Sequence, residues 1–329
     1  MSTSARRETI YARFRSEGVL GIGEGAPIAR YHEVAAAAVR TLTAERPALE
    51  ELAPLSLEDA SARTARLLPR QRAAQAAVDI ARYDWQASRA HVPLYRMLGV
   101  DPEATPVTSY SIGIAAPAEV RSKVLEAAPY PVLKIKMGLG TDEAILDAVR
   151  GATSKPIRVD ANEGWTDPET ALRKIEWLST QGVEFVEQPL PAGDVDAARW
   201  VHARSPLPIF ADEAAIDADA VPGLVGAYDG VNIKLDKCGG ITPALRMIRA
   251  ARDAGLRTML GCMVSSSVSV TAAAHLSPLV DYADLDGNLL IAHDPYHGVT
   301  VRGGRLVLPR GPGLGLVPAK ARRPGRRGP

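Results

Sequence analysis

Cysteine, net charge and long apolar runs are all scarce in this chain of 329 residues, and each scarcity excludes a class of protein. The two cysteines, Cys238 and Cys262, lie far apart, which excludes a disulfide framework and indicates a reducing, cytoplasmic location. No apolar run reaches the roughly 20 residues that span a bilayer, and the start, MSTSARRETIYARF, lacks the apolar core of a secretory signal. The net charge of +1 predicts neither nucleic acid nor a membrane surface as a partner.

The composition, with 46% hydrophobic and 23% charged residues, is typical of a globular protein with a large core. Thr9–Arg15 alternates like a strand, and GVLGIGEGAP predicts a glycine-rich turn and a second strand, as in a hairpin. Helical patterns follow at about Tyr31–Thr43 and Leu57–Leu98. We therefore predict an N-terminal α+β capping domain over residues 1–106.

Short apolar runs recur over residues 107–294, and each is followed by a helical pattern. The eight runs are VTSYSIGI, VLKIKMG, IRVDANEG, VEFVEQPL, PIFADEA, VNIKLDKCGG, TMLGCM and DYADLDGN. This alternation predicts a parallel sheet closed as a (β/α)8-type (TIM) barrel. An open doubly wound sheet is the alternative, but no run begins a G-x-G-x-x-G turn. We expect residues 295–318 to return to the capping domain and residues 319–329 to form a basic, disordered tail.

Polar residues stand at the predicted carboxyl ends of these strands, where a (β/α)8 barrel carries its active site. Successive carboxylates at Asp160, Glu187 and Asp212 are 27 and 25 residues apart, about one strand–helix unit. They can therefore converge on one point from neighbouring strands. Carboxylates gathered in an apolar barrel mouth must be protonated or share a cation, and an all-oxygen set favours a hard cation, magnesium (Mg²⁺). The alternative for each single acid is a structural ion pair with a lysine.

The run VLKIKMG contains Lys134 and Lys136, which the two-residue repeat of a strand places on one face. Lys234 ends the sixth run, on the far side of the predicted barrel. Close cationic neighbours and a dry site are expected to lower the pKa of a lysine, which makes it a general base. Two bases on opposite faces of one carbon are what a 1,1-proton transfer requires.

The motifs LKIKMG, RVDANEGW, FVEQPL, FADE and VNIKLDKCGG resemble the enolase superfamily in its muconate-lactonizing branch, from about Gly18 to Gly315. The resemblance implies that the three acids bind Mg²⁺. It also implies that Lys136 and Lys234 are the acid/base pair, with Lys134 assisting Lys136.

The segment ADLDGN places Asp284 and Asp286 at the end of the eighth strand. This Asp-x-Asp resembles the dipeptide epimerases of the L-Ala-D/L-Glu type, which act on murein peptides, and implies that the pair holds the α-ammonium group of a dipeptide. The alternative is a solvated strand end or a helix N-cap. Met263 and Ser265, after the seventh strand, are further candidate substrate-binding residues, although Ser265–Ser267 also fits a helix cap.

Two other functions stay open at this point. One is a lyase or cycloisomerase of the same fold, such as an o-succinylbenzoate synthase or muconate cycloisomerase. The other is a catalytically impaired homologue that binds metal and ligand, because the N-terminal part of the capping domain, with its first strand and mobile loop, is expected to be truncated. Arg6 and Arg7 are candidate substitutes for an arginine that the family uses there. A homo-oligomer is one alternative for the assembly.

Overall fold

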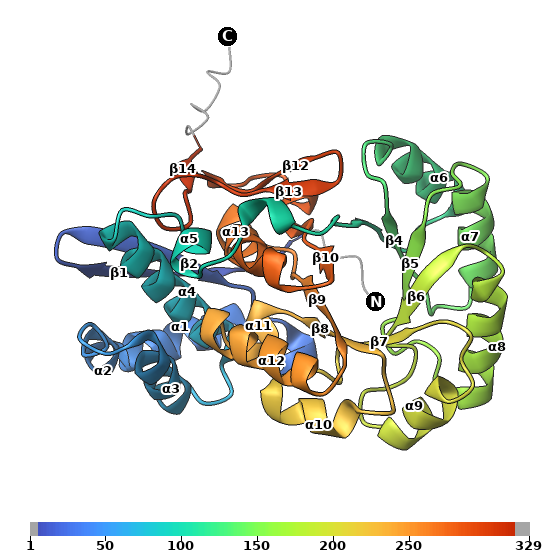
Figure 1. The fold of residues 1–329 in the computed structure, drawn as a ribbon, viewed down its shortest axis with the longest axis horizontal. Helices are drawn as coiled ribbons and strands as arrows, with labels where there is room; N and C mark the ends of the chain where they lie inside the picture. Colours follow the sequence, from blue (N-terminus) through green and yellow to red (C-terminus); the bar gives the residue numbers. More distant parts are fainter. Residues whose placement is uncertain (1–5, 320–329) are drawn as a thin grey trace, which may run out of the picture.

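The carboxylate-bearing strands form one parallel sheet in the computed structural model, which describes residues 6–319 (Figure 1). All eight predicted runs are strands, paired in the order β10-β9-β8-β7-β6-β5-β4-β3. A parallel bridge between Thr108 and Ala283 links the start of the first strand to the last, so the sheet nearly closes as the predicted barrel. The strands are β3 (Tyr110–Ile112), β4 (Leu133–Lys136), β5 (Ile157–Asp160), β6 (Val183–Glu187), β7 (Ile209–Ala211), β8 (Gly230–Ile233), β9 (Arg257–Gly261) and β10 (Tyr282–Asp284).

Helices follow the strands and bury one face against them. Their apolar residues recur at helical spacing, as in α7, where Ile145, Leu146 and Val149 are buried. The helices of the barrel are α6 (Pro117–Glu126), α7 (Asp142–Arg150), α8 (Pro168–Ser179), α9 (Val195–His202), α10 (Val221–Leu224), α11 (Leu235–Cys238), α12 (Ile241–Asp253) and α13 (Ser267–Leu276).

An aromatic layer fills the barrel interior below the strand ends. Phe185, Phe210 and Met259 form one cluster with Tyr282, and the Phe185 and Phe210 ring centroids lie 4.4 Å apart. The Arg158 guanidinium carbon lies 5.4 Å from the Phe185 ring centroid. Because side chains two apart on a strand share a face, the residues two positions further on also point inward. The resulting pairs are Arg158 and Asp160, Phe185 and Glu187, Phe210 and Asp212, and Tyr282 and Asp284.

The N-terminal unit begins with the predicted hairpin, in which β1 (Ile10–Ser16) pairs antiparallel with β2 (Val19–Gly25). A helix, α4 (Arg72–Arg89), lies directly on β2, on the side where Gly21, Gly23 and Gly25 alternate. A Cβ atom at these glycines would stand 2.1, 2.0 and 1.9 Å from carbonyl oxygens of α4. The motif GIGEG therefore serves close packing of a helix on a strand.

The helical pattern predicted from Leu57 to Leu98 is divided into three helices in the structure. They are α3 (Leu57–Leu67), α4 and α5 (Leu94–Met97). The first break contains Pro69 and Arg70, whose φ of 61° lies in the left-handed region, and Pro93 precedes α5. A proline removes a helical hydrogen bond and a left-handed residue cannot continue a right-handed helix. The pattern at Tyr31–Thr43 is the 3₁₀ turn η1 (Ala29–Tyr31) followed by α1 (Ala35–Ala44), with α2 (Arg46–Glu50) after it.

The C-terminal segment packs back against the N-terminal unit. It contains the short strands β11 (Tyr296–His297), β12 (Thr300–Arg302), β13 (Arg305–Val307) and β14 (Val317–Pro318). Leu94 N donates to Gly313 O, and Thr105 Oγ1 donates to Leu306 O at 3.0 Å. These contacts support the proposed division of the chain, in which residues 295–318 belong with residues 1–106. The predicted basic tail lies outside the described residues except for Ala319.

Buried carboxylates join the N-terminal unit to the rest of the chain by accepting backbone N–H groups. Asp84 of α4 accepts from Ile22 N at 2.8 Å and from Leu314 N at 2.7 Å. Asp79 of the same helix accepts from Thr242 N at 3.0 Å. Burial raises the pKa of both Asp79 and Asp84 to about 6. These carboxylates are therefore held by backbone donors at the junction of three parts of the chain.

We expect the Asp84→Ala variant to lose about 2–4 kcal/mol of unfolding free energy, because two buried N–H groups lose their acceptor. Guanidinium chloride denaturation measures this. The matched control is Glu176→Ala on the exposed side of α8, which should change stability by less than about 0.5 kcal/mol. Equal effects of the two substitutions would contradict a joining role for Asp84.

Candidate active site

Three carboxylates from adjacent strands meet at the barrel mouth. Asp160 and Glu187 are the last residues of β5 and β6, and Asp212 follows β7 by one position. Their side chains are at most 1% exposed, and one oxygen of each lies within 4.8 Å of the others. The convergence predicted from their spacing is thus present.

The donor set fits a hard divalent cation. An octahedral Mg²⁺ with oxygens at about 2.1 Å places neighbouring ligand oxygens about 3 to 4 Å apart, close to the separation in this triad. The cluster also lacks enough positive charge to keep every acid ionised, since burial and the charge of Asp160 raise the pKa of Glu187 to about 7. A cation among the three oxygens would remove that penalty, so Asp160, Glu187 and Asp212 are suited to hold Mg²⁺.

Lys134 lies below the mouth, where its ammonium group contacts several carboxylates at once. Its Nζ atom is 2.9 Å from Asp160 Oδ2, 2.7 Å from Glu187 Oε2 and 2.8 Å from Asp284 Oδ2. Burial alone would lower the pKa of Lys134, but the charges of these three acids outweigh burial and raise it. Lys134 is therefore an ion-paired cation in this arrangement.

Lys136 and Lys234 contact opposite members of the triad. Lys136 Nζ, from β4, lies 2.5 Å from Asp160 Oδ2, and Lys234 Nζ, just past β8, lies 2.7 Å from Asp212 Oδ2. Four strand positions separate β4 from β8 in an eight-stranded sheet, so the two lysines approach from opposite sides. Burial opposes the charge of Lys234, yet Asp212 raises its pKa. The acids thus place one ammonium group on each flank of the cluster.

A further lysine, which the sequence reasoning did not single out, fixes Asp212. Lys237 Nζ donates to Asp212 Oδ1 at 2.5 Å and to Asn232 O at 2.8 Å, and it is 3% exposed. Asn232 in turn donates its side-chain N–H to Glu187 Oε1 at 2.7 Å. Both could have been found from spacing, because Asn232 lies two residues before Lys234 on the strand and Lys237 lies one helical turn after it.

Asn162 and Glu213 form a second connection, toward Lys136. Lys136 Nζ donates to Asn162 Oδ1 at 2.9 Å, and Asn162 Nδ2 donates to Glu213 Oε1 at 3.2 Å. Asn162 has a left-handed backbone, with φ of 43°. Burial and the charge of Asp212 raise the pKa of Glu213 to about 8. The amide of Asn162 is thus oriented with its oxygen toward Lys136.

Asp284 and Asp286 are both buried but have different partners. Asp284 pairs with Lys134 and accepts from Ser109 Oγ at 2.7 Å. Asp286 accepts from the backbone N–H of Ser111 at 2.5 Å, and burial together with Asp284 raises its pKa to about 6. Asp286 is therefore the member of the pair with capacity for an added cation.

Met263 and Ser265 follow β9. Ser265 is buried and its Oγ donates to Met263 O at 3.1 Å, while the neighbouring Ser266 caps α13. Ser265 also lines a cavity of about 510 Å³ between the N-terminal segment and the loops after β9 and β10, together with Arg6 and Arg7. The two arginines thus lie on the same cavity as a candidate substrate-binding residue.

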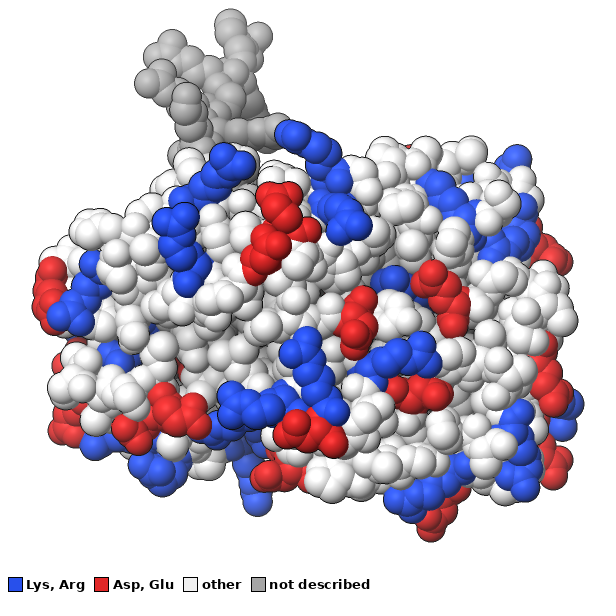
Figure 2. Space-filling model, in the orientation of Figure 1, with Lys and Arg blue, Asp and Glu red and all other residues white. Residues whose placement is uncertain are grey.

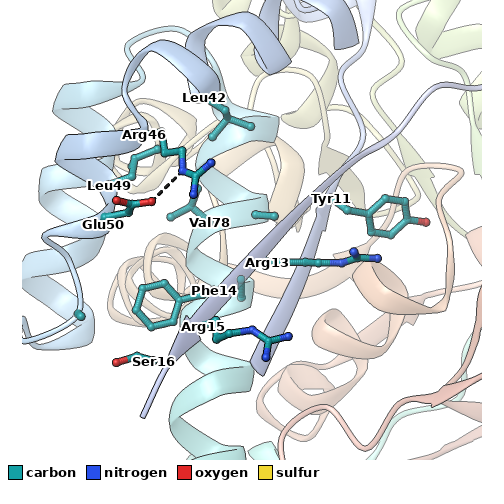
Figure 3. A pocket seen from close by; sticks show the side chains of 13 residues that line it. Tyr11, Arg13, Phe14, Arg15, Ser16, Leu42, Arg46, Leu49, Glu50 and Val78 are labelled. Atoms are coloured by element: carbon teal, nitrogen blue, oxygen red, sulfur yellow. Dashed lines mark hydrogen bonds and ion pairs between the residues drawn. The ribbon is translucent and has the colours of Figure 1, made fainter. Parts of the chain in front are cut away.

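A larger cavity, of about 740 Å³, lies elsewhere. It is bounded by β1 and by helices α1, α2 and α4, with Phe14, Leu42 and Leu49 among its apolar residues (Figure 3). None of the candidate site residues lines it. Cavity volume alone would therefore indicate a binding site away from the carboxylate cluster.

On the face that Figure 2 shows, no large patch carries charge of a single sign. Lysine and arginine side chains are interspersed there with aspartate and glutamate. Among residues 6–319, no helix combines the length and apolar character needed to cross a membrane.

Known proteins are similar in sequence to this chain along nearly its whole length. Residues 1–99 match the family model "Mandelate racemase / muconate lactonizing enzyme, N-terminal domain", and residues 116–322 match "Enolase C-terminal domain-like". The L-Ala-D/L-Glu epimerase of Bacteroides thetaiotaomicron is 40% identical over 321 residues, which cover 96% of this chain and 83% of that protein. The L-Ala-D/L-amino acid epimerase of Pedosphaera parvula is 43% identical over 294 residues, or 88% of this chain and 84% of that protein.

A solved structure has a closely similar fold. The dipeptide epimerase from Enterococcus faecalis complexed with Mg and the dipeptide L-Leu-L-Tyr has a TM-score of 0.88 and 33% sequence identity. The match covers 94% of this chain and 92% of that one.

Mg²⁺ binding should tighten as the pH rises from 6 to 8. Glu187, with a pKa of about 7, is about one-tenth ionised at pH 6 and about nine-tenths at pH 8, so the affinity should rise about ninefold. Isothermal titration with MgCl₂ at the two pH values measures this.

Glu187→Gln is the control for this dependence, since it should weaken binding and flatten its change with pH. An affinity that is constant between pH 6 and 8 in the unmodified protein would exclude Glu187 as an ionised ligand.

Proposed function

We propose that this chain, which belongs to the mandelate racemase/muconate lactonizing enzyme family of the enolase superfamily, is a Mg²⁺-dependent dipeptide epimerase. It inverts the α-carbon of the C-terminal residue of a dipeptide of the L-Ala-D/L-Glu type. The observation that carries this function is the placement of Lys136 and Lys234 against opposite members of one carboxylate triad. An isomerase that removes a proton from one face and returns one to the other needs this pair.

Different residues of the barrel mouth carry out different parts of the proposed reaction. Mg²⁺ held by Asp160, Glu187 and Asp212 supplies positive charge next to the substrate carboxylate, where negative charge develops as the enolate forms. One lysine of the pair Lys136 and Lys234 takes the α-proton as a neutral amine, and the other, as an ammonium, donates a proton to the opposite face. The roles of the two exchange when the opposite epimer is the substrate.

The raised pKa of Lys234 is compatible with a role as general base, because the acid that raises it also binds the metal in this proposal. The charge of Asp212 raises the pKa of Lys234, and the same carboxylate is a proposed metal ligand. A divalent cation offsets that charge, which lets the lysine pKa fall toward the range of a general base. Lys134 stays paired with Asp284 below the mouth and keeps Lys136 beside a second positive charge.

Substrate recognition follows from the acids at the end of β10. Asp286 has capacity for a cation, so we assign to it the main contact with the α-ammonium group, supported by Asp284. Met263 and Ser265 belong to the loop beside this pair and contribute to the wall of the pocket.

An ammonium pocket favours a dipeptide over the substrates of the alternative enzymes. Neither an o-succinylbenzoate synthase nor a muconate cycloisomerase needs buried carboxylates for an ammonium group. The presence of both lysines argues against a catalytically impaired homologue. We also propose a role in murein peptide metabolism and a cytoplasmic location. The location is supported by two cysteines that are both free.

Incubation with L-Ala-L-Glu and Mg²⁺ in D₂O should replace the α-hydrogen of the C-terminal residue by deuterium and yield the second epimer without an elimination product. Proton NMR follows both changes. Lys136→Ala and Lys234→Ala should each lower epimerisation by about 10²–10⁴-fold, because each removes one of the two proton carriers. Lys123→Ala on the outer face of α6, in an exposed ion pair with Glu119, is the control and should leave the rate unchanged. Formation of an alkene without inversion would indicate a lyase instead.

The Asp286→Asn variant should raise KM for the free dipeptide by about tenfold, since a charged partner of the ammonium group is replaced by an amide. The N-acetylated dipeptide, which has no ammonium group, is the matched control. Its turnover should be low on the unmodified enzyme and no lower on the variant. An equal loss on both substrates would mean that Asp286 supports the fold of the site and does not recognise the ammonium group.

A further inference from the structure

Two acids of the triad each have one oxygen that is held by a side chain of the protein. Glu187 Oε1 accepts from Asn232 Nδ2 at 2.7 Å, and Asp212 Oδ1 accepts from Lys237 Nζ at 2.5 Å. Asn232 is 0% exposed and Lys237 is 3% exposed, so bulk water does not compete with either bond. One oxygen of each acid is therefore committed to a buried donor.

Lys237 is fixed by backbone carbonyl groups. An ammonium group has three N–H donors, and Lys237 directs one of them at the Asp212 carboxylate. The other two go to Asp212 O at 2.5 Å and to Asn232 O at 2.8 Å. Because β7 and β8 determine where these carbonyl oxygens lie, the position of the ammonium group is set by the sheet.

The amide of Asn232 is fixed by packing against the next strand. Asn232 lies within β8 and is opposite Met259 of β9. A Cβ atom at Gly261 of β9 would stand 2.5 Å from Asn232 Oδ1 and 2.8 Å from its Nδ2. The absence of a side chain at Gly261 thus leaves the space in which the amide reaches Glu187.

The other oxygen of each acid is turned toward the lysines of the barrel mouth. Glu187 Oε2 and Asp160 Oδ2 share the Nζ atom of Lys134, at 2.7 and 2.9 Å. Asp212 Oδ2 lies 2.7 Å from Lys234 Nζ. These three oxygens face cationic groups, so they are the ones that a metal ion can take.

Asp160 shows the same division, with a backbone donor in place of a side chain. Its Oδ1 accepts from the backbone N–H of Asn162 at 3.0 Å. Each acid of the triad can therefore offer a single oxygen, which leaves half of an octahedral coordination sphere for substrate and water. Single oxygens suit Mg²⁺, whereas Ca²⁺ takes more oxygens at longer distances, often two from one carboxylate.

We propose that Lys237 and Asn232 restrict Asp212 and Glu187 to one metal-facing oxygen each, and that this restriction makes the site select Mg²⁺ over the larger Ca²⁺. The inference rests on the proposed function for the assignment of the acids as metal ligands. Lys237 and Asn232 are positioning residues, because they act through the acids and contact neither the ion nor the substrate.

Calorimetric titration of the metal-free protein with MgCl₂ and with CaCl₂, in the absence of a dipeptide, tests this selection. The ratio of the Mg²⁺ to the Ca²⁺ binding constant should fall by about tenfold in Lys237→Met and in Asn232→Ala, because the released carboxylate can offer both oxygens to Ca²⁺. The control is Lys155→Met, which should leave the ratio unchanged. Lys155 also donates to two backbone carbonyls, those of Ala127 and Ala128, but it precedes β5 at the end away from the acids.

The ratio separates this inference from a purely electrostatic or structural role. Loss of the Lys237 charge alone would change the affinity for both ions by the same factor, since the two ions carry equal charge, and Asn232→Ala changes no charge. Thermal melting identifies a variant that does not fold, and the variant of the other residue then decides. An unchanged ratio in the folded variants would overturn the proposal.

Crystal structures of the metal complexes give a readout that does not depend on affinity. In the unmodified protein with Mg²⁺, Asp212 and Glu187 should each place one oxygen about 2.1 Å from the ion. In Lys237→Met with Ca²⁺, both oxygens of Asp212 should lie about 2.3–2.6 Å from the ion. Binding of Mg²⁺ by two oxygens of either acid in the unmodified protein would overturn the proposal.

The outcomes also separate this inference from the proposed function. A ratio that falls in both variants, in a protein that acts on no dipeptide when unmodified, would refute the proposed function and retain the restriction of the acids. An unchanged ratio together with normal turnover of L-Ala-L-Glu would refute the restriction and retain the function. An unmodified protein that binds no Mg²⁺ would refute both.

Discussion

The structure depends on one constraint, which is that three carboxylates of like charge lie close together in a space that excludes most water. Asp160, Glu187 and Asp212 are almost fully buried within a few ångströms of one another, and such a group is stable only when cations are placed among its members. Lys134 and Lys237 supply part of that charge from below and beside the acids. The remaining deficit, visible in the raised pKa of Glu187, makes the mouth a site for a divalent cation.

The same charges also distinguish the lysines of the barrel mouth from one another. Lys134 is surrounded by three acids and is fixed as a cation, whereas Lys136 and Lys234 each contact one outer member of the triad. A cation that binds the triad weakens the hold of the acids on these two lysines. In the proposed function, the metal and the two lysines share carboxylates, and inversion follows from the opposite positions of β4 and β8 in the sheet.

The N-terminal unit contributes by contacts of a different kind. Its junction with the rest of the chain is made by buried carboxylates that accept backbone N–H groups, such as Asp84 and Asp236, and these fix the backbone without needing a particular partner side chain. The ion pair of Arg30 with Glu163 adds a charged contact to the loop that follows β5. The unit is thus connected to the loops that follow β5 and β6 as well as to the outside of the barrel.

The sequence by itself determined the eight strands, their order along the chain and the residues at their ends. Strand periodicity and the spacing of one strand–helix unit are local properties of the chain. It also identified Lys136 and Lys234 as partners of the three acids. It did not indicate the break around Pro69, the acids that raise the pKa of Lys134, or the pairing of Arg30 with Glu163. Only the tertiary structure decided these, since a pKa depends on every charge within a few ångströms and a contact across 133 residues leaves no periodic trace in the sequence.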